Sequence, residues 1–212
     1  MKPPSLDFEI ELLRSGATRV VGIDEVGRGA LAGPVCVGVA VVDASVTSVP
    51  IGLADSKLIS EKRRDALVPA LKDWVVAYGI GYAEPAEIDE IGIIGALRRA
   101  GIRALQQLPF TPEVAILDGS HNWLSRGDDL FFDGADLVTP PVHMRVKADR
   151  DCAAVAAASV LAKVDRDARM VKLDAQFPGY GFASNKGYGS AEHQAAIAAR
   201  GLTDAHRRSW NI

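Results

Sequence analysis

The sequence predicts an α/β protein with a mixed central sheet, in which the first three strands are antiparallel and helices cover both faces. Two apolar strand patterns lie close together near the start, separated by a short glycine-rich connection, as in an antiparallel pair. Later strand patterns alternate with long helical ones, as in crossover units. The 212 residues, 48% of them hydrophobic, are enough for one well-buried core.

The expected strands are short apolar runs. Residues 19–26 are apolar on both faces and predict a central strand, and residues 34–42 predict its antiparallel partner. Three more strands are expected at 74–82, where two glycines weaken the pattern, at 113–117, and at 142–147, where apolar and polar residues alternate.

The expected helices lie between and after these strands. Residues 60–72 predict a helix with Ser60 as its N-cap and Pro69 as a kink or break, and residues 85–107 are mostly helical. Residues 151–173 predict a long helix whose first half consists of small side chains, so it can lie very close to a sheet. A last helix is expected to begin at Ser190.

Composition and targeting signals narrow the class of protein. No run reaches the ~18 apolar residues that a membrane span needs, and the start lacks the apolar core of a signal peptide. The two cysteines, Cys36 and Cys152, lie in apolar segments and indicate buried side chains rather than a disulfide framework. We therefore expect a cytoplasmic protein. Its net charge of −3 is weak evidence against a general polyanion binder, and basic residues cluster at 145–147, 163–169 and 207–208.

Acidic residues stand at the ends of three of the expected apolar strands: Asp24 with Glu25, Asp118, and Asp149. Sites gather at strand ends along one rim of an open α/β sheet. Converging carboxylates repel and raise one another's pKa, and a pair of Mg²⁺ or Mn²⁺ ions removes that repulsion. Because no Cys or His pattern has zinc spacing, oxygen-bound metals are the natural choice. Two-metal clusters of this kind hydrolyse phosphodiesters.

Each acid alone also has a purely structural explanation. Asp118 precedes a glycine, as turn residues often do, and Asp149 or Asp151 could be a helix N-cap. Asp24 and Glu25 could pair with Arg28. Successive side chains on a flat strand point to opposite faces, so these two acids share a cluster only if the strand ends or bulges there. Three acid-terminated strands together favour a site.

Other polar motifs suggest contacts with a ligand. The turn Gly27-Arg28-Gly29 lets bare backbone approach another molecule. Residues 185–189 (NKGYG) combine an amide, an ammonium and an aromatic ring on a glycine-rich turn, which suits a phosphate and a sugar or base, although such loops are often plain turns. From spacing alone, Asp55-Ser56-Lys57 indicates a polar turn, and His193 and His206 indicate surface or capping histidines. The long stretch 119–141 either carries function or contains a short element.

Together these motifs resemble one family, the bacterial type 2 ribonucleases H, or ribonuclease HII. The resemblance extends from about residue 18 to 210. The motifs that carry it are VVGIDEVGRGALAGPV (20–35), LADSK (53–57), ILDG (116–119), KAD (147–149), AAASVLAKVDRD (156–167), NKGYGSAEH (185–193) and HRRSW (206–210).

The resemblance implies an RNase H-like fold in a single catalytic domain over residues 1–212, with the C-terminal helices from about 174 packed on it. It makes Asp24, Glu25, Asp118 and Asp149 the catalytic carboxylates of a two-metal site for Mg²⁺ or Mn²⁺. The implied substrates are RNA–DNA hybrids, cut in the RNA strand, and duplex DNA with one embedded ribonucleotide, nicked on its 5′ side. The products carry a 3′-hydroxyl and a 5′-phosphate.

The resemblance also assigns substrate contacts. The backbone of Gly27, Arg28 and Gly29, with the Tyr188 hydroxyl, would recognise the ribose 2′-OH, which separates RNA from DNA. Lys57 and Lys186 would contact phosphates, and the protein would be a monomer. The alternatives are a catalytically silent hybrid-binding protein and another nuclease with this fold. The four acids argue against the first, and the glycine-flanked turn with its tyrosine argues against the second.

Overall fold

The computed structural model describes residues 3–125 and 139–210. Its centre is a five-stranded sheet in the order β3-β2-β1-β4-β5. The strands are β1 (Arg19–Val26), β2 (Val35–Asp43), β3 (Ala77–Ala83), β4 (Val114–Asp118) and β5 (Val142–Arg145). The first three strands pair antiparallel, whereas β4 runs parallel to β1 and β5 parallel to β4. The predicted mixed sheet is confirmed.

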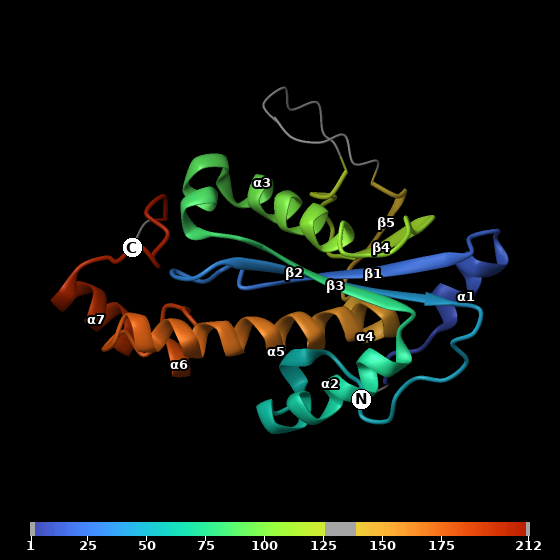
Figure 1. Ribbon diagram of the computed structural model, residues 1–212, viewed down its shortest axis with the longest axis horizontal. Helices are drawn as coiled ribbons and strands as arrows, with labels where there is room; N and C mark the ends of the chain where they lie inside the picture. Colours follow the sequence, from blue (N-terminus) through green and yellow to red (C-terminus); the bar gives the residue numbers. More distant parts are fainter. Residues whose placement is uncertain (1–2, 126–138, 211–212) are drawn as a thin grey trace.

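Helices cover both faces of the sheet (Figure 1). The apolar core on one face includes residues of α1 (Asp7–Arg14), α2 (Glu61–Trp74) and α5 (Ala153–Gln176), and α3 (Pro85–Leu105) packs on the other. The short helices α6 (Phe182–Asn185) and α7 (Ala191–Arg200) follow α5, and α6 joins an apolar cluster with the end of α5. Among the described helices, none combines the length and apolarity that crossing a membrane requires.

The long helix α5 lies directly against β1, as its small side chains predict. A Cβ atom on Gly22 would lie 2.3 Å from the main-chain atoms of Ala154 and Val155, a distance at which side chains do not fit. Gly38 on β2 meets α5 in the same way, with Ala158 O at 2.5 Å from its ideal Cβ position. Glycine at these strand positions therefore permits the close contact of helix and sheet.

Several boundaries differ from the predictions. Pro69 does not break α2, which continues to Trp74, so β3 begins later than expected, at Ala77. The strand expected over 142–147 ends at Arg145. Lys147 has φ +62° and begins the short helix α4 (Ala148–Asp151), after which α5 starts at Ala153.

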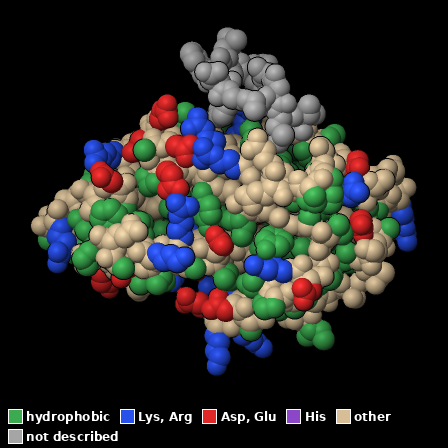
Figure 2. Space-filling model, viewed as in Figure 1, with side chains coloured by type: hydrophobic (Ala, Val, Ile, Leu, Met, Phe, Trp, Pro, Cys, Tyr) green, Lys and Arg blue, Asp and Glu red, His purple; other side chains and the backbone are tan. Residues whose placement is uncertain are grey.

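Other elements were either anticipated or missed. The last helix, α7, begins next to Ser190, close to the predicted start, and Ser190 is its N-cap, whose side chain accepts the His193 amide. Helix α1, the 3-10 turn η1 (Ser56–Leu58) and α6 were not predicted. Most of the stretch 119–141 lies outside the described residues. Figure 2 shows Lys, Arg, Asp and Glu side chains interspersed over one face of the molecule.

Candidate active site

Three of the four predicted carboxylates lie on the α5 side of the sheet. Gly22 faces α5, so Asp24, two residues further along β1, lies on the same face and is only 4% exposed. Asp118 ends β4, the parallel neighbour of β1. Its Oδ1 accepts the Ala148 amide at 2.7 Å. This bond joins the first residue of α4 to the end of β4, so that Asp149 comes next to Asp118.

Asp149 therefore does not follow its strand directly, as the sequence suggested. It lies inside α4 and is 4% exposed. The N-cap of this helix is Lys147, so Asp149 is not a capping residue. The left-handed backbone at Lys147 is what turns the chain from β5 into α4.

Glu25 lies on the opposite face from Asp24. The pairing of β1 with β2 continues residue by residue through Glu25 and Val26, so the strand does not bulge and its side chains alternate. Arg28 Nη1 donates to Glu25 Oε1 at 3.4 Å, which is the strand-end ion pair considered from sequence. Within the described ranges, Glu25 Oε2 is buried and has no hydrogen-bond partner.

The acids are buried without enough positive charge. Burial and the charges of the three other acids raise the pKa of Asp24 from 3.8 to about 8, against the opposing effect of the Ser159 hydroxyl. Burial and the nearby Asp118 carboxylate raise the pKa of Asp149 to about 6. Burial also raises the pKa of Glu25, although the Arg28 charge opposes it.

The donor set fits a hard divalent cation. All four side chains offer carboxylate oxygens, which are the ligands that Mg²⁺ and Mn²⁺ prefer. The unpartnered Glu25 Oε2 and the raised pKa values of Asp24 and Asp149 indicate a site that lacks cationic charge. In residues 3–125 and 139–210, no three Asp, Glu, His or Cys side chains lie close enough together to hold a metal ion as they stand. Asp24 and Glu25 leave β1 on opposite faces, yet both line the cavity at the end of that strand.

A cavity of about 420 Å³ opens beside two of these acids. Its described lining consists of Asp24, Glu25, Val26, Gly27, Arg28, Gly29, Ser56, Lys57, Lys163 and Tyr188. The cavity thus brings together the predicted glycine-flanked turn, Lys57 and Tyr188 with two of the acids. Gly27 has φ +82°, and a Cβ atom there would lie 2.1 Å from Arg166 Nε, so this position requires glycine.

Lys57 lies at the mouth of the site. It follows Asp55, whose carboxylate accepts the Lys57 amide at 2.9 Å and so forms the expected polar turn. The Lys57 side chain is 74% exposed, and its Nζ lies 3.9 Å from Asp149 Oδ2. Partial burial works against its charge, but the surrounding carboxylates, Asp24 and Asp149 foremost, raise the pKa of Lys57 overall.

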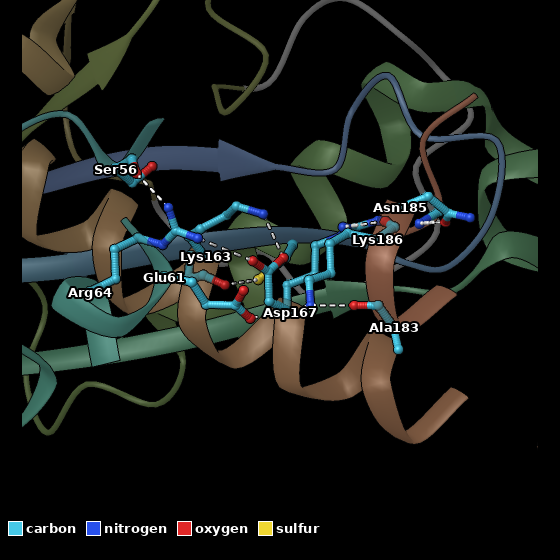
Figure 3. A network of polar contacts seen from close by, with 12 residues as sticks. Ser56, Glu61, Arg64, Lys163, Asp167, Ala183, Asn185 and Lys186 are labelled. Atoms are coloured by element: carbon cyan, nitrogen blue, oxygen red, sulfur yellow. Dashed lines mark hydrogen bonds and ion pairs between the residues drawn. The ribbon is translucent and has the colours of Figure 1, made fainter. Parts of the chain in front are cut away.

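The structure does not bring Lys186 into this group. Its Nζ donates to the Ala183 carbonyl at 2.7 Å and lies 3.3 Å from Glu61 Oε1 (Figure 3). Lys186 is not among the described residues that line the cavity. The predicted phosphate contact of Lys186 therefore has no support from its position.

Three polar residues near the site were missed from the sequence: Ser56, Ser159 and Lys163. Ser56 and Lys163 line the cavity, and the Ser159 hydroxyl donates to Ser56 Oγ at 2.9 Å. Lys163 Nζ donates to Asp167 at 2.5 Å, and Arg64 lies 3.6 Å from the other oxygen of Asp167 (Figure 3). A signal was available, because Ser159, Lys163 and Asp167 are spaced by four and so share one face of the predicted helix.

The fold and this carboxylate set define a class of protein, the metal-dependent hydrolases that act on phosphodiester bonds. The family model described as Ribonuclease HII matches residues 21–212. A ribonuclease HII of Streptomyces avermitilis is 45% identical over 211 residues, which cover 99% of this chain and 84% of the relative. The chain belongs to the ribonuclease HII family and is a metal-dependent ribonuclease H.

Solved structures agree with this assignment. The ribonuclease H2 of Pyrococcus horikoshii OT3 has a TM-score of 0.69 and 27% identity, over 91% of this chain and 94% of that chain. The structure of Bst-RNase HIII in complex with Mn²⁺ has a TM-score of 0.67 and 22% identity, over 92% of this chain and 68% of that chain. The second comparison shows a shared fold alone.

Proposed function

We propose that this protein is an endonuclease that cuts the RNA strand of RNA–DNA hybrids and nicks duplex DNA on the 5′ side of a single embedded ribonucleotide. The products would be a 3′-hydroxyl and a 5′-phosphate. One observation carries the proposal: Asp24 and Glu25 line the same cavity as the Gly27–Gly29 turn and Tyr188. The turn and Tyr188 would bind the ribose 2′-OH next to the acids that hydrolyse the phosphodiester. Cutting would then be restricted to RNA, or to a lone ribonucleotide in DNA.

The four acids Asp24, Glu25, Asp118 and Asp149 would hold two divalent cations, Mg²⁺ or Mn²⁺. When bound, such a pair supplies an activated water molecule and stabilises the leaving oxygen. The unpartnered Glu25 Oε2 and the raised pKa values of Asp24 and Asp149 support this assignment, because bound cations would supply the missing charge.

The other cavity residues would bind the substrate. Arg28 and Gly29 are exposed, and in the described part of the chain their amides donate no hydrogen bond, so both are available to a ribose hydroxyl. Tyr188 would add its hydroxyl from the other side of the cavity. Lys57, exposed and next to Asp149, would bind a backbone phosphate. Lys186 could do so only after leaving Ala183 and Glu61.

We propose one catalytic domain over the whole chain, acting as a monomer, with the helices from about residue 174 packed on it. Phe182 of α6 and Met170 of α5 share an apolar cluster, which supports that packing. Both cysteines are buried and free, which suits the reducing cytoplasm. The role in the cell would be the removal of RNA and single ribonucleotides from DNA.

The test uses an end-labelled DNA duplex with one ribonucleotide and an all-DNA duplex of the same sequence, each incubated with Mg²⁺, Mn²⁺ or EDTA. We expect a metal-dependent nick immediately 5′ of the ribonucleotide and an intact control. Cleavage of both duplexes would indicate another nuclease of this fold. Binding without cleavage would indicate a silent hybrid-binding protein.

A further inference from the structure

The segment from Thr203 to Trp210 packs against the connection that follows the Gly27–Gly29 turn. Gly33 N donates to Ala205 O at 2.7 Å, and Arg207 N donates to Leu31 O at 2.9 Å. In Figure 1 this C-terminal segment lies beside the β1–β2 connection. The two segments are thus joined by main-chain hydrogen bonds, which place the Arg207 side chain beside the glycine-flanked turn that lines the cavity.

The side chain of Arg207 holds the glycine-flanked turn from below. It is fully buried, and its guanidinium donates to Gly27 O at 2.6 Å, to Arg28 O at 2.8 Å and to Gly33 O at 3.1 Å. In a trans peptide the carbonyl and the following amide point in opposite directions. By fixing the carbonyls of Gly27 and Arg28 inward, Arg207 directs the amides of Arg28 and Gly29 outward, where these two residues are exposed.

His206 is linked to Tyr188 through hydrogen bonds made by a second histidine, His193. Both rings are buried. The Thr203 amide donates to His206 Nδ1 at 3.0 Å, so a neutral His206 carries its proton on Nε2. His206 Nε2 then donates to His193 Nε2, and the two nitrogens lie 3.1 Å apart. The His193 proton is therefore on Nδ1, which donates to the Tyr188 carbonyl oxygen at 2.9 Å. With both rings neutral, this one arrangement of protons satisfies every contact.

The connection that follows the Gly27–Gly29 turn is also hydrogen-bonded to the loop that carries Tyr188, residues 185–189. Gly187 O accepts the amides of Leu31 at 2.8 Å and Ala32 at 3.1 Å. Another buried side chain, Arg166, donates to Lys186 O at 3.0 Å, and its guanidinium lies 5.6 Å from the centre of the Tyr188 ring. The loop that carries Tyr188 is therefore held by main-chain bonds and by two buried side chains, His193 and Arg166.

We propose that His193 and Arg207 are positioning residues for ribose recognition, Arg207 by aiming the amides of Arg28 and Gly29, and His193, which His206 orients, by placing Tyr188. The inference rests on the proposed function, in which the turn and the tyrosine read the 2′-OH. Its consequence is specific. Disturbing either contact weakens recognition of a ribonucleotide without weakening the binding of DNA in general.

The test separates the two kinds of binding. The KM for the duplex with one ribonucleotide is compared with the inhibition constant of the all-DNA duplex used as a competitor. His193→Leu removes the donor to the Tyr188 carbonyl, whereas His193→Asn retains an N–H near Nδ1 and is the matched control. We expect His193→Leu to raise KM about tenfold, the value of one hydrogen bond, with the inhibition constant unchanged. His193→Asn should stay close to wild type.

Arg207→Lys independently tests whether Arg207 orients the amides of Arg28 and Gly29. Lysine keeps the charge but lacks the planar fork that holds two neighbouring carbonyls, so KM should again rise about tenfold against an unchanged inhibition constant. A folded variant with the wild-type ratio of these constants would overturn the role of its residue, as would equal losses in His193→Leu and His193→Asn. If one variant does not fold by circular dichroism, the other decides. A wild-type protein that cleaves both duplexes would instead refute the proposed function.

Discussion

Glu9 is a buried carboxylate whose ionisation should weaken the protein as the pH rises. It lies on α1 and is fully buried. Its Oε1 accepts the amide of Ala154, the second residue of α5, at 2.8 Å, and its Oε2 has no partner among the described residues. Burial, opposed only in part by nearby backbone amides, raises the pKa of Glu9 from 4.5 to about 7.

The size of the effect follows from that shift. Folded Glu9 binds its proton more tightly than unfolded Glu9 does, so its contribution to stability is complete below pH 4.5 and is lost as the pH rises to about 7. At 1.36 kcal/mol for each pKa unit, the full loss is about 3 kcal/mol. Between pH 5 and pH 8 the free energy of unfolding should therefore fall by about 2.5 kcal/mol because of Glu9 alone.

Urea denaturation of the wild type and of Glu9→Gln at several pH values isolates the contribution of Glu9 ionisation to the free energy of unfolding. Glutamine keeps the acceptor for the Ala154 amide but cannot ionise, and every other titrating group cancels in the difference between the two proteins. The stability of the wild type relative to Glu9→Gln should fall by about 2.5 kcal/mol from pH 5 to pH 8. Glu11→Gln, on the exposed side of α1, is the matched control. A flat difference for Glu9→Gln, or the same slope for Glu11→Gln, would refute the reasoning.

The remaining predictions concern the sheet and the site. Gly22→Ala should lower the free energy of unfolding in urea by about 1–3 kcal/mol, because α5 leaves no room for the methyl group; a loss below about 0.5 kcal/mol would contradict this. Asp118→Asn should abolish cleavage with an unchanged circular dichroism spectrum, and wild-type turnover would remove Asp118 from the site. Tyr188→Ala and Tyr188→Phe should both cut more slowly at a single ribonucleotide, and a wild-type rate for Tyr188→Phe would exclude its hydroxyl from recognition. Mg²⁺ or Mn²⁺ at 100 times its dissociation constant should stabilise the wild type by about 2.7 kcal/mol in thermal melts, and Asp24→Asn should lose most of that gain.

Much of the fold could be predicted because its strongest signals are local. Residues 19–26 are apolar on both faces and form the centre of the sheet, and the small residues of α5 indicated its close contact with β1. Tertiary packing decided where local signals were weak. Leu71 lies beyond Pro69 in the same helix and is fully buried in the core, so packing maintains α2 through a residue that disfavours it.

The site was less predictable because its geometry depends on distant contacts. In the sequence, Glu9 is one of several charged residues that alternate with apolar ones near the start of the chain. In the structure it accepts the amide of Ala154 on α5, 145 residues away. His193 and His206 were expected at the surface or at a helix cap. They are instead buried and bonded to each other, because the turn after α7 folds the chain back on itself. No local pattern indicates such a pair.

The contact between α5 and β1 sets both the stability and the chemistry of the site. Gly22 lets the helix approach, and Asp24, on the same face of β1, is buried by that approach. Burial raises the pKa of Asp24 to about 8, so the metal-free protein disfavours the carboxylate that a cation would bind. The same helix places Ser159 where its hydroxyl lowers the pKa of Asp24, and Lys163, one turn further along α5, in the lining of the cavity. Tight packing therefore makes Asp24 costly to ionise, and a divalent cation bound to its carboxylate would relieve this cost.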